Sequence, residues 1–291
     1  MDLAALAPYI DWAPFFQTWD LAGPYPAILK DEVVGVEAQK VFNDAQKMLQ
    51  KIIEGRWITA HGVMGLYPAN SINHDDIALY ANEARETPVL TWHGLRQQTE
   101  KQTGKPSRCL ADFVAPKETG IEDYMGAFCV STGFGTAELA AEFEKDHDDY
   151  NSIMIKAIAD RLAEAFAEYL HEKVRKEYWG YASKEVLSNQ DLIKEEYKGI
   201  RPAPGYPACP DHTEKWTIWD LLSVKETIGV ELTDSLAMWP AASVSGYYFA
   251  NEQAKYFGLG KITEEQLVDF AKRKKMAYEV AKKWLNPNLA E

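Results

Sequence analysis

Apolar and polar residues follow one another along much of the chain with the three- and four-residue spacing of amphipathic helices. One such stretch runs over Val33–Ile53, where Gly55 is placed to end the helix. Another covers Thr136–Glu144, and after an acidic break the pattern resumes over Tyr150–Tyr178. We expect a helix over each stretch, with the longest one over Tyr150–Tyr178.

Other runs are short, rich in β-branched and aromatic residues, and bounded by Gly, Pro or Asn, as is typical of strands. These runs are Trp57–Tyr67, Asp76–Tyr80, Pro88–Trp92, Met125–Ser131, Ser235–Trp239, Gly246–Phe249 and Lys255–Gly258. Helices and strands are segregated rather than alternating as βαβ units. The pattern therefore predicts an α+β fold around a largely antiparallel, twisted sheet.

Two segments rich in proline are less regular. Residues 1–32 also carry many aromatic residues and predict an ordered, extended arm. The loop Arg201–Pro210 contains four prolines and leads into a short helix expected over residues 213–224.

A C-terminal helix is expected to open at Thr263, because Thr263 and Gln266 have the spacing of a capping box. No internal repeat or linker interrupts the pattern. We therefore expect residues 1–291 to form a single domain.

Composition narrows the class of protein. Hydrophobic residues make up 46% of the chain and aromatic residues 12%, which excludes a disordered protein. Lys and Arg number 31 against 44 Asp and Glu, so the net charge is 31 − 44 = −13, which argues against nucleic acid and membrane surfaces as partners. Cys109, Cys129 and Cys209 are odd in number and widely spaced, as expected for a cytoplasmic protein without a disulfide framework.

Two local motifs suggest ligands but favour simpler explanations. Gly133-Phe134-Gly135 follows a predicted strand, yet Glu138 takes the place of the third glycine of a dinucleotide-binding turn, so an ordinary turn with Thr136 as N-cap is favoured. Cys209 and His212 have metal-ligand spacing, but no second pair matches them. Helix capping by Asp211 or Thr213 is favoured there, and no metal is expected.

The segment Ile200–His212 is the strongest candidate for binding. Its prolines stiffen the loop, Arg201 suits planar recognition of a carboxylate or phosphate, and Gly205 allows a close backbone approach. From the residues alone, it is a rigid binding loop or a merely structural connection.

This segment, Arg-Pro-Ala-Pro-Gly-Tyr-Pro-Ala-Cys-Pro-Asp-His, resembles the signature of the C-terminal activation domain of cobalamin-dependent methionine synthase. The resemblance spans the chain. It includes the stretches Ile10–Phe16, Leu95–Lys101, Cys109–Phe113, Ala159–Glu168, Leu232–Ser235, Ser243–Phe249 and Tyr256-Phe257. It implies that domain's fold.

The resemblance also implies a function. The family binds S-adenosylmethionine and remethylates cobalamin that has been oxidised out of the catalytic cycle, after an electron from flavodoxin or a related reductase has produced Co(I). The implied ligand contacts are Asp11, Arg201, Ala203, Gly205, Tyr206, Tyr256 and Phe257, and the implied cobalamin-facing residues are Asp160 and Glu164. No catalytic acid or base is expected, because methyl transfer from sulfur to cobalt moves no proton.

The chain lacks the D-x-H-x-x-G motif of a corrinoid-binding domain. Cobalamin should therefore be carried by a partner domain, and the chain is interpreted as a methyltransferase module, either an excised domain or a subunit of a split enzyme. A non-catalytic S-adenosylmethionine-binding module and a reactivator of another corrinoid methyltransferase remain alternatives. Lys173, Arg175 and Lys176 form a candidate basic patch for an acidic electron donor.

Overall fold

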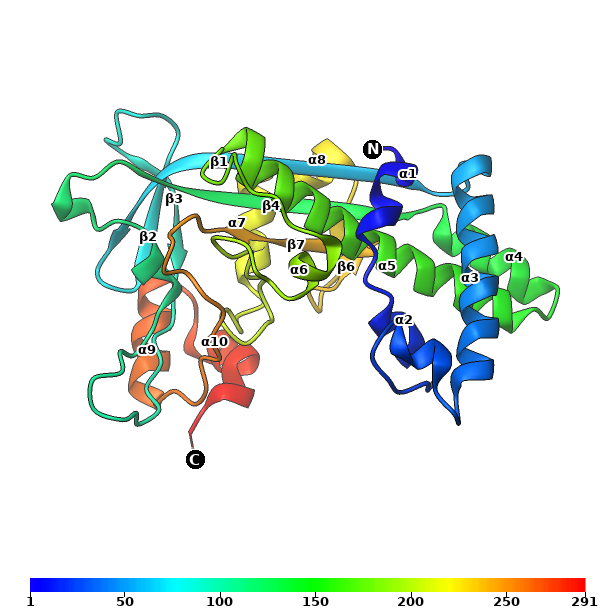
Figure 1. Ribbon diagram of the computed structural model, residues 1–291. Helices are drawn as coiled ribbons and strands as arrows, with labels where there is room; N and C mark the ends of the chain where they lie inside the picture. The colour runs from blue at the N-terminus through cyan, green and yellow to red at the C-terminus, as the bar shows by residue number, and fades with distance from the viewer. Residues whose placement is uncertain (291) are drawn as a thin grey trace.

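A computed structural model describes residues 1–290 and is built on a five-stranded antiparallel sheet in the order β3-β2-β1-β4-β7 (Figure 1). The strands are β1 (Thr59–Ile72), β2 (Asp76–Tyr80), β3 (Pro88–His93), β4 (Asp123–Phe134) and β7 (Ser243–Tyr248). A separate ribbon pairs β5 (Glu231–Leu232) with β6 (Met238–Trp239). The predicted α+β fold with an antiparallel sheet is confirmed.

The interior strand β4 contributes side chains to two separate apolar clusters, one on each face of the sheet, because successive side chains of a strand point in opposite directions. Phe128 and Val130 belong to the cluster that contains α5 (Asp149–Lys173) and α3 (Gly35–Gly55). Ala127 and Cys129 belong to the cluster that contains α7 (Glu214–Leu222) and α8 (Val224–Ile228). The sheet is therefore covered by helices on both sides.

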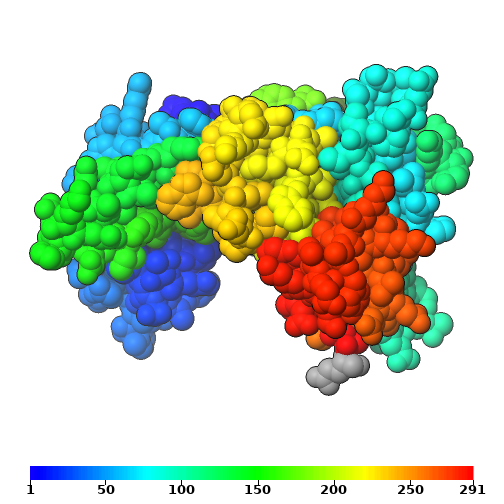
Figure 2. All heavy atoms as spheres, turned by 180° about the vertical axis from the view of Figure 1, so that it is seen from behind, coloured from blue at the N-terminus to red at the C-terminus, as the bar shows by residue number. Residues whose placement is uncertain are grey.

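The remaining helices lie around this core. They are α1 (Leu3–Leu6), α2 (Ala13–Gln17), α4 (Thr136–Lys145), α6 (Asn189–Ile193), α9 (Glu264–Arg273) and α10 (Tyr278–Leu285), with short helical turns η1 (Ala7–Tyr9), η2 (Ala27–Lys30), η3 (Leu110–Phe113), η4 (Lys117–Thr119), η5 (Val174–Tyr178) and η6 (Asn286–Asn288). The outline is notched between the part near the N-terminus and the α9–α10 pair (Figure 2). No helix of residues 1–290 has an apolar stretch long enough to cross a bilayer.

The two main helix predictions hold with shifted ends. α3 begins at Gly35 and stops at Gly55, where Arg56 takes a left-handed conformation with φ 49°. α5 is the longest helix at 25 residues, but it gives way to the π-helical turn η5 at Val174.

The prediction of an extended N-terminal arm is wrong. Asp2 caps α1 by accepting a hydrogen bond from the Ala4 backbone N–H at 3.0 Å. Proline sits in the first turn of both η1 and α2, where its missing N–H costs nothing. These local signals fold the arm into short helices that bury Phe15 and Phe16.

Two strand predictions and two capping predictions also need correction. Lys255–Gly258 forms no strand, and Ser235–Trp239 is a strand only at its last two residues. The N-cap of α4 is Gly135 rather than Thr136, since the backbone there has φ 93°. Thr263 does cap α9, but the Gln266 side chain bonds the backbone of Arg96 instead of completing a capping box.

Candidate functional site

The proline-rich loop lines the larger of two adjoining cavities, with a volume of about 690 Å³. The loop provides one wall, and the remaining walls come from β4, β7, α5 and the segment after β7. The loop residues that line it are Arg201, Pro202, Ala203, Pro204, Gly205, Tyr206, Pro207 and Ala208. The predicted binding loop is thus the wall of a cavity.

Backbone hydrogen bonds hold the loop in one shape. The Gly205 N–H donates to the Cys209 carbonyl at 2.8 Å, and the Cys209 N–H donates to the Tyr206 carbonyl at 2.9 Å. The Tyr247 N–H of β7 donates to the Pro202 carbonyl at 2.9 Å and ties the loop to the sheet. At the rim of the cavity, the Tyr206 side chain remains 61% exposed.

Gly205 cannot be replaced without moving the cavity wall. Its φ of +92° is a conformation that residues with a side chain rarely adopt, and an added Cβ would lie 2.4 Å from Cε1 of His212. Gly205→Ala should therefore cost about 1–2 kcal/mol for the left-handed backbone and displace the His212 ring. We expect severalfold weaker ligand binding by titration calorimetry. Unchanged affinity in this variant would show that the loop shape does not matter for binding.

Arg201 is the cationic centre of the site. Its Nη1 lies 3.0 Å from Oε2 of Glu168 and donates to the Tyr197 hydroxyl at 2.9 Å, while its backbone N–H donates to the Tyr256 hydroxyl at 3.0 Å. Burial disfavours the charged form, but Glu168, Tyr197, Tyr256 and Glu164 together outweigh this effect and raise the pKa of Arg201 above its usual value. The hydrogen bonds that Arg201 makes from its guanidinium to the described residues run through Nη1, so Nε and Nη2 are free for a planar anionic ligand.

Two carboxylates face Arg201 across the cavities. Glu164 lies one helical turn before Glu168 on α5, so both point from the same face of the helix. Glu195 follows the end of α6 in a left-handed conformation with φ 58°. Burial raises the pKa of both Glu164 and Glu195, and Arg201 partly offsets this effect in each case. The two cavities therefore share one planar cation, Arg201, and these two acidic groups.

A second cavity of about 340 Å³ adjoins the first and shares Arg201, Glu164 and Glu195 with it. Asp11 lines this second cavity, and its Oδ1 accepts a hydrogen bond from the Ala13 N–H at 3.0 Å. The N-terminal helices thus bring Asp11 to the second cavity, which it lines together with Arg201.

Most of the predicted contact residues meet at this site. Arg201, Ala203, Gly205, Tyr206, Tyr256 and Phe257 line the larger cavity, and Glu164 lines both. Asp160 lines neither cavity: it is exposed and pairs with Arg161 at 2.5 Å. Glu195 was not predicted, because Lys194-Glu195-Glu196 has the composition of a solvated turn and nothing local indicates that Glu195 lines a cavity.

The predicted basic patch at the end of the long helix is wrong. The side chain of Arg175 is 0% exposed and binds Glu185, with Nη2 2.7 Å from Oε1. Lys173 and Lys176 pair with Glu177 and Glu172 within the same helical surface. These residues leave no free positive patch for a partner.

Among residues 1–290, no three or more His, Cys, Asp or Glu side chains are grouped so that they could hold a metal ion. Asp211 instead accepts from the backbone N–H of Thr213 at 2.9 Å and from its hydroxyl at 2.6 Å. Thr213 is the N-cap residue of α7, as one form of the capping prediction had it, but its side chain accepts no hydrogen bond from the helix; Asp211 stabilises the turn before α7 instead.

The regions of the chain that match known proteins include the whole site. Residues 2–275 match a family model described as "Vitamin B12 dependent methionine synthase, activation domain". The chain is also similar to a crystal structure of the MetH reactivation domain bound to AdoHcy, with 57% sequence identity and a TM-score of 0.97 over 100% of this chain and 89% of that one. Both matches include every residue that lines the two cavities.

Proposed function

Because the chain belongs to the family of activation domains of vitamin B12-dependent methionine synthase, we propose that its cavities bind S-adenosylmethionine and present the methyl group to a cobalamin carried by a partner domain. The observation that carries this proposal is that Arg201 meets two carboxylates, those of Glu164 and Glu195, and a rigid loop around the two cavities. The solved relative binds AdoHcy, which is the product left when S-adenosylmethionine gives up its methyl group.

The charges of the site complement those of the ligand. S-adenosylmethionine carries a carboxylate, an ammonium group and a cationic sulfonium. The free Nε and Nη2 of Arg201 suit the carboxylate, and Asp11, which lines the second cavity, suits the ammonium. Glu164 and Glu195 supply negative charge for the sulfonium, while Phe128, Tyr256 and Phe257 offer apolar surface to the adenosyl part.

The role of the chain in the reaction is alignment. A reduced flavoprotein would first give one electron to Co(II) of a cobalamin carried by the docked partner domain. The resulting Co(I) would be the nucleophile that takes the methyl group from sulfur, and S-adenosylhomocysteine would be left in the site. The chain fixes the sulfonium in place through Arg201 and the loop, so that one face of the methyl group is open to attack. Asp160 lies one turn before Glu164 on α5, and we propose that this stretch faces the incoming cobalamin.

Titration calorimetry with matched ligands tests the proposal. S-adenosylmethionine and S-adenosylhomocysteine should both bind, while decarboxylated S-adenosylmethionine should bind at least tenfold more weakly, because it cannot pair with Arg201. Equal affinity for the decarboxylated analogue would remove the proposed carboxylate site. A methyl-transfer assay with a cobalamin domain and a chemical reductant then separates a reactivation module from a simple binding module, since only the former forms methylcobalamin.

The acidic pair makes the affinity depend on pH. The pKa values of Glu164 and Glu195 are raised, so both groups accept protons at a higher pH than an ordinary glutamate would. Each protonation removes a negative charge that favours the sulfonium, so affinity for S-adenosylmethionine should fall as the pH is lowered, beginning above the usual pKa of about 4.3. The neutral thioether of S-adenosylhomocysteine should show a smaller loss. Parallel titrations of both ligands between pH 8 and pH 5 check this, and identical pH profiles would contradict it.

A further inference from the structure

A groove whose charged lining residues are all cationic lies outside the ligand cavities. It has a volume of about 510 Å³, and its charged lining residues are Lys101, Lys105, Arg108 and Lys255. No ion pair within residues 1–290 involves any of these cations. Their charges are therefore not neutralised within the chain.

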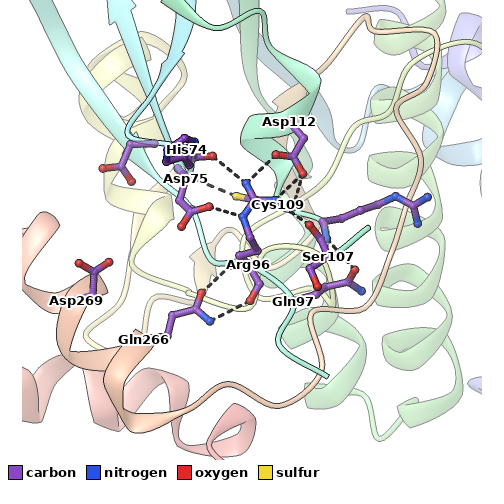
Figure 3. Close-up of polar contacts among 12 residues, drawn as sticks. His74, Asp75, Arg96, Gln97, Ser107, Cys109, Asp112, Gln266 and Asp269 are labelled. Atoms are coloured by element: carbon purple, nitrogen blue, oxygen red, sulfur yellow. Dashed lines mark hydrogen bonds and ion pairs between the residues drawn. The ribbon is translucent and has the colours of Figure 1, made fainter. Parts of the chain in front are cut away.

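Arg96 anchors the loop that carries three of these cations (Figure 3). Its Nε donates to Asp75 at 2.7 Å, its Nη2 donates to Asp112 at 2.7 Å, and its Nη1 donates to the carbonyl of Ser107 near the far end of the loop at 2.8 Å. Because Arg96 holds both the start and the end of the loop, the cations are presented from a fixed base rather than from a free strand of chain.

Further bonds close the loop on itself. The Gln97 N–H donates to the Arg108 carbonyl at 2.9 Å, and the Arg108 N–H donates to Oε1 of Gln97 at 3.0 Å. Lys101 donates to the Pro106 carbonyl at 2.8 Å. The backbone that carries the groove cations is thus held in place, and the Lys101 side chain is itself fixed by a hydrogen bond.

The groove lies next to the proposed ligand site. Lys255 directly precedes Tyr256 and Phe257, which line the larger cavity. The side-chain amide of Gln97 donates to the Gly258 carbonyl at 2.6 Å and joins the loop to the same segment. A protein seated on the groove would therefore stand beside the place where the methyl donor is held.

The local charge is opposite to that of the whole chain. Residues 97–108 carry three cations and one acid, Glu100, so their net charge is 3 − 1 = +2, and Lys255 raises it to +3. The chain as a whole carries −13. The negative charge of the chain as a whole repels a partner with an acidic face, so the positive groove determines where on the chain such a partner binds.

We propose that this groove docks the acidic face of the protein that delivers the electron for reactivation, which rests on the function proposed above. One electron leaves the reduced flavin of that donor and takes Co(II) to Co(I), and the groove supplies no atom to the reaction. Its task is to hold the donor beside the cavity. Attraction at the groove should make the association rate fall as salt is added, although the net charge of the chain alone would predict the reverse.

The test compares two charge reversals that change the net charge equally. Lys105→Glu/Arg108→Glu/Lys255→Glu reverses three of the four groove cations and leaves Lys101 in place. The control, Lys40→Glu/Lys51→Glu/Lys145→Glu, lies on α3 and α4 at the opposite end of the molecule (Figure 1). Each variant has a net charge of −13 − 6 = −19. Association of a reduced, acidic flavodoxin with each full chain is followed at low and high salt, and reactivation of a cobalamin domain is measured with flavodoxin and with titanium(III) citrate.

The groove variant should associate with flavodoxin about tenfold more slowly than the control variant and lose its salt dependence. Its reactivation should be slow with flavodoxin and normal with the chemical reductant. Equal rates for the two variants would overturn the proposal, as would a groove variant that is equally slow with titanium(III) citrate. Calorimetry with S-adenosylmethionine on the wild-type chain tests the proposed function separately, so failure of one does not resemble failure of the other.

Discussion

Arg201→Ala should weaken S-adenosylmethionine binding by about 1.5–3 kcal/mol, the usual contribution of hydrogen bonds to a charged group. The loss comes from the free edge of the guanidinium, because Nη1 is already committed to Glu168 and Tyr197. The substitution also removes a cation from a buried carboxylate, so the free energy of unfolding should drop by about 1–3 kcal/mol. Titration calorimetry and urea denaturation without ligand measure the two effects independently.

Arg201→Lys is the matched comparison. Lysine can keep the charge beside Glu168 but cannot present two parallel N–H groups, so it should restore part of the stability and little of the affinity. If Arg201→Ala loses stability yet keeps wild-type affinity, Arg201 is a structural partner of Glu168 and the assignment of the ligand carboxylate is wrong.

Lys274→Met should be the most destabilising single change outside the cavities. Its Nζ lies 2.6 Å from Oδ2 of Asp211 and 2.5 Å from Oε1 of Glu214, and all three side chains are almost fully buried. Burial opposes the charge, but the two carboxylates prevail and raise the pKa of Lys274. Without the lysine two buried carboxylates face each other, and breaking such a cluster costs about 3–5 kcal/mol.

Urea denaturation of Lys274→Met against Lys272→Met checks this, since Lys272 is exposed on the same helix and forms no ion pair within the described chain. The Lys272 variant should match the wild type within about 0.5 kcal/mol. Asp211 follows the proline-rich loop, so residual folded Lys274→Met should also bind the ligand less tightly. A Lys274 variant as stable as its control would mean that Asp211 and Glu214 find other partners.

Local patterns predicted most of the scaffold. The spacing of apolar residues located α3 and α5, although only α3 buries a single stripe, whereas α5 buries four consecutive residues from Ala165 to Glu168. The strand β1 extends beyond its predicted end at Tyr67 because its backbone keeps pairing, first with β4 and then with β2 as far as Ile72. Residues such as Pro68 and Asn70 weaken the local strand signal there, and only the neighbouring strands supply what the sequence pattern lacks.

The parts that were not predicted depend on partners far away in the sequence. Glu195 lines both cavities beside Arg201 because it directly follows α6, and a Glu in a charged turn carries no sign of that placement. Arg175 has the local pattern of a surface cation, yet Glu185 and Glu168 bury it. The contact residues implied by the family resemblance do lie together, since all of them except Asp160 line one of the two cavities.

Tyr206 is largely uncovered at the cavity rim, and this has a consequence for how the methyl donor is used. With the function proposed above, a methyl donor bound beside this open rim would stay in contact with water, so the chain alone would hold an activated methyl group without shielding it or offering it an acceptor. Insulation from water must arrive with the docking domain, when a second surface closes over Tyr206. Binding of the methyl donor and transfer of its methyl group would thereby be separate steps, and transfer would occur only when a partner domain with inactive cobalamin has docked.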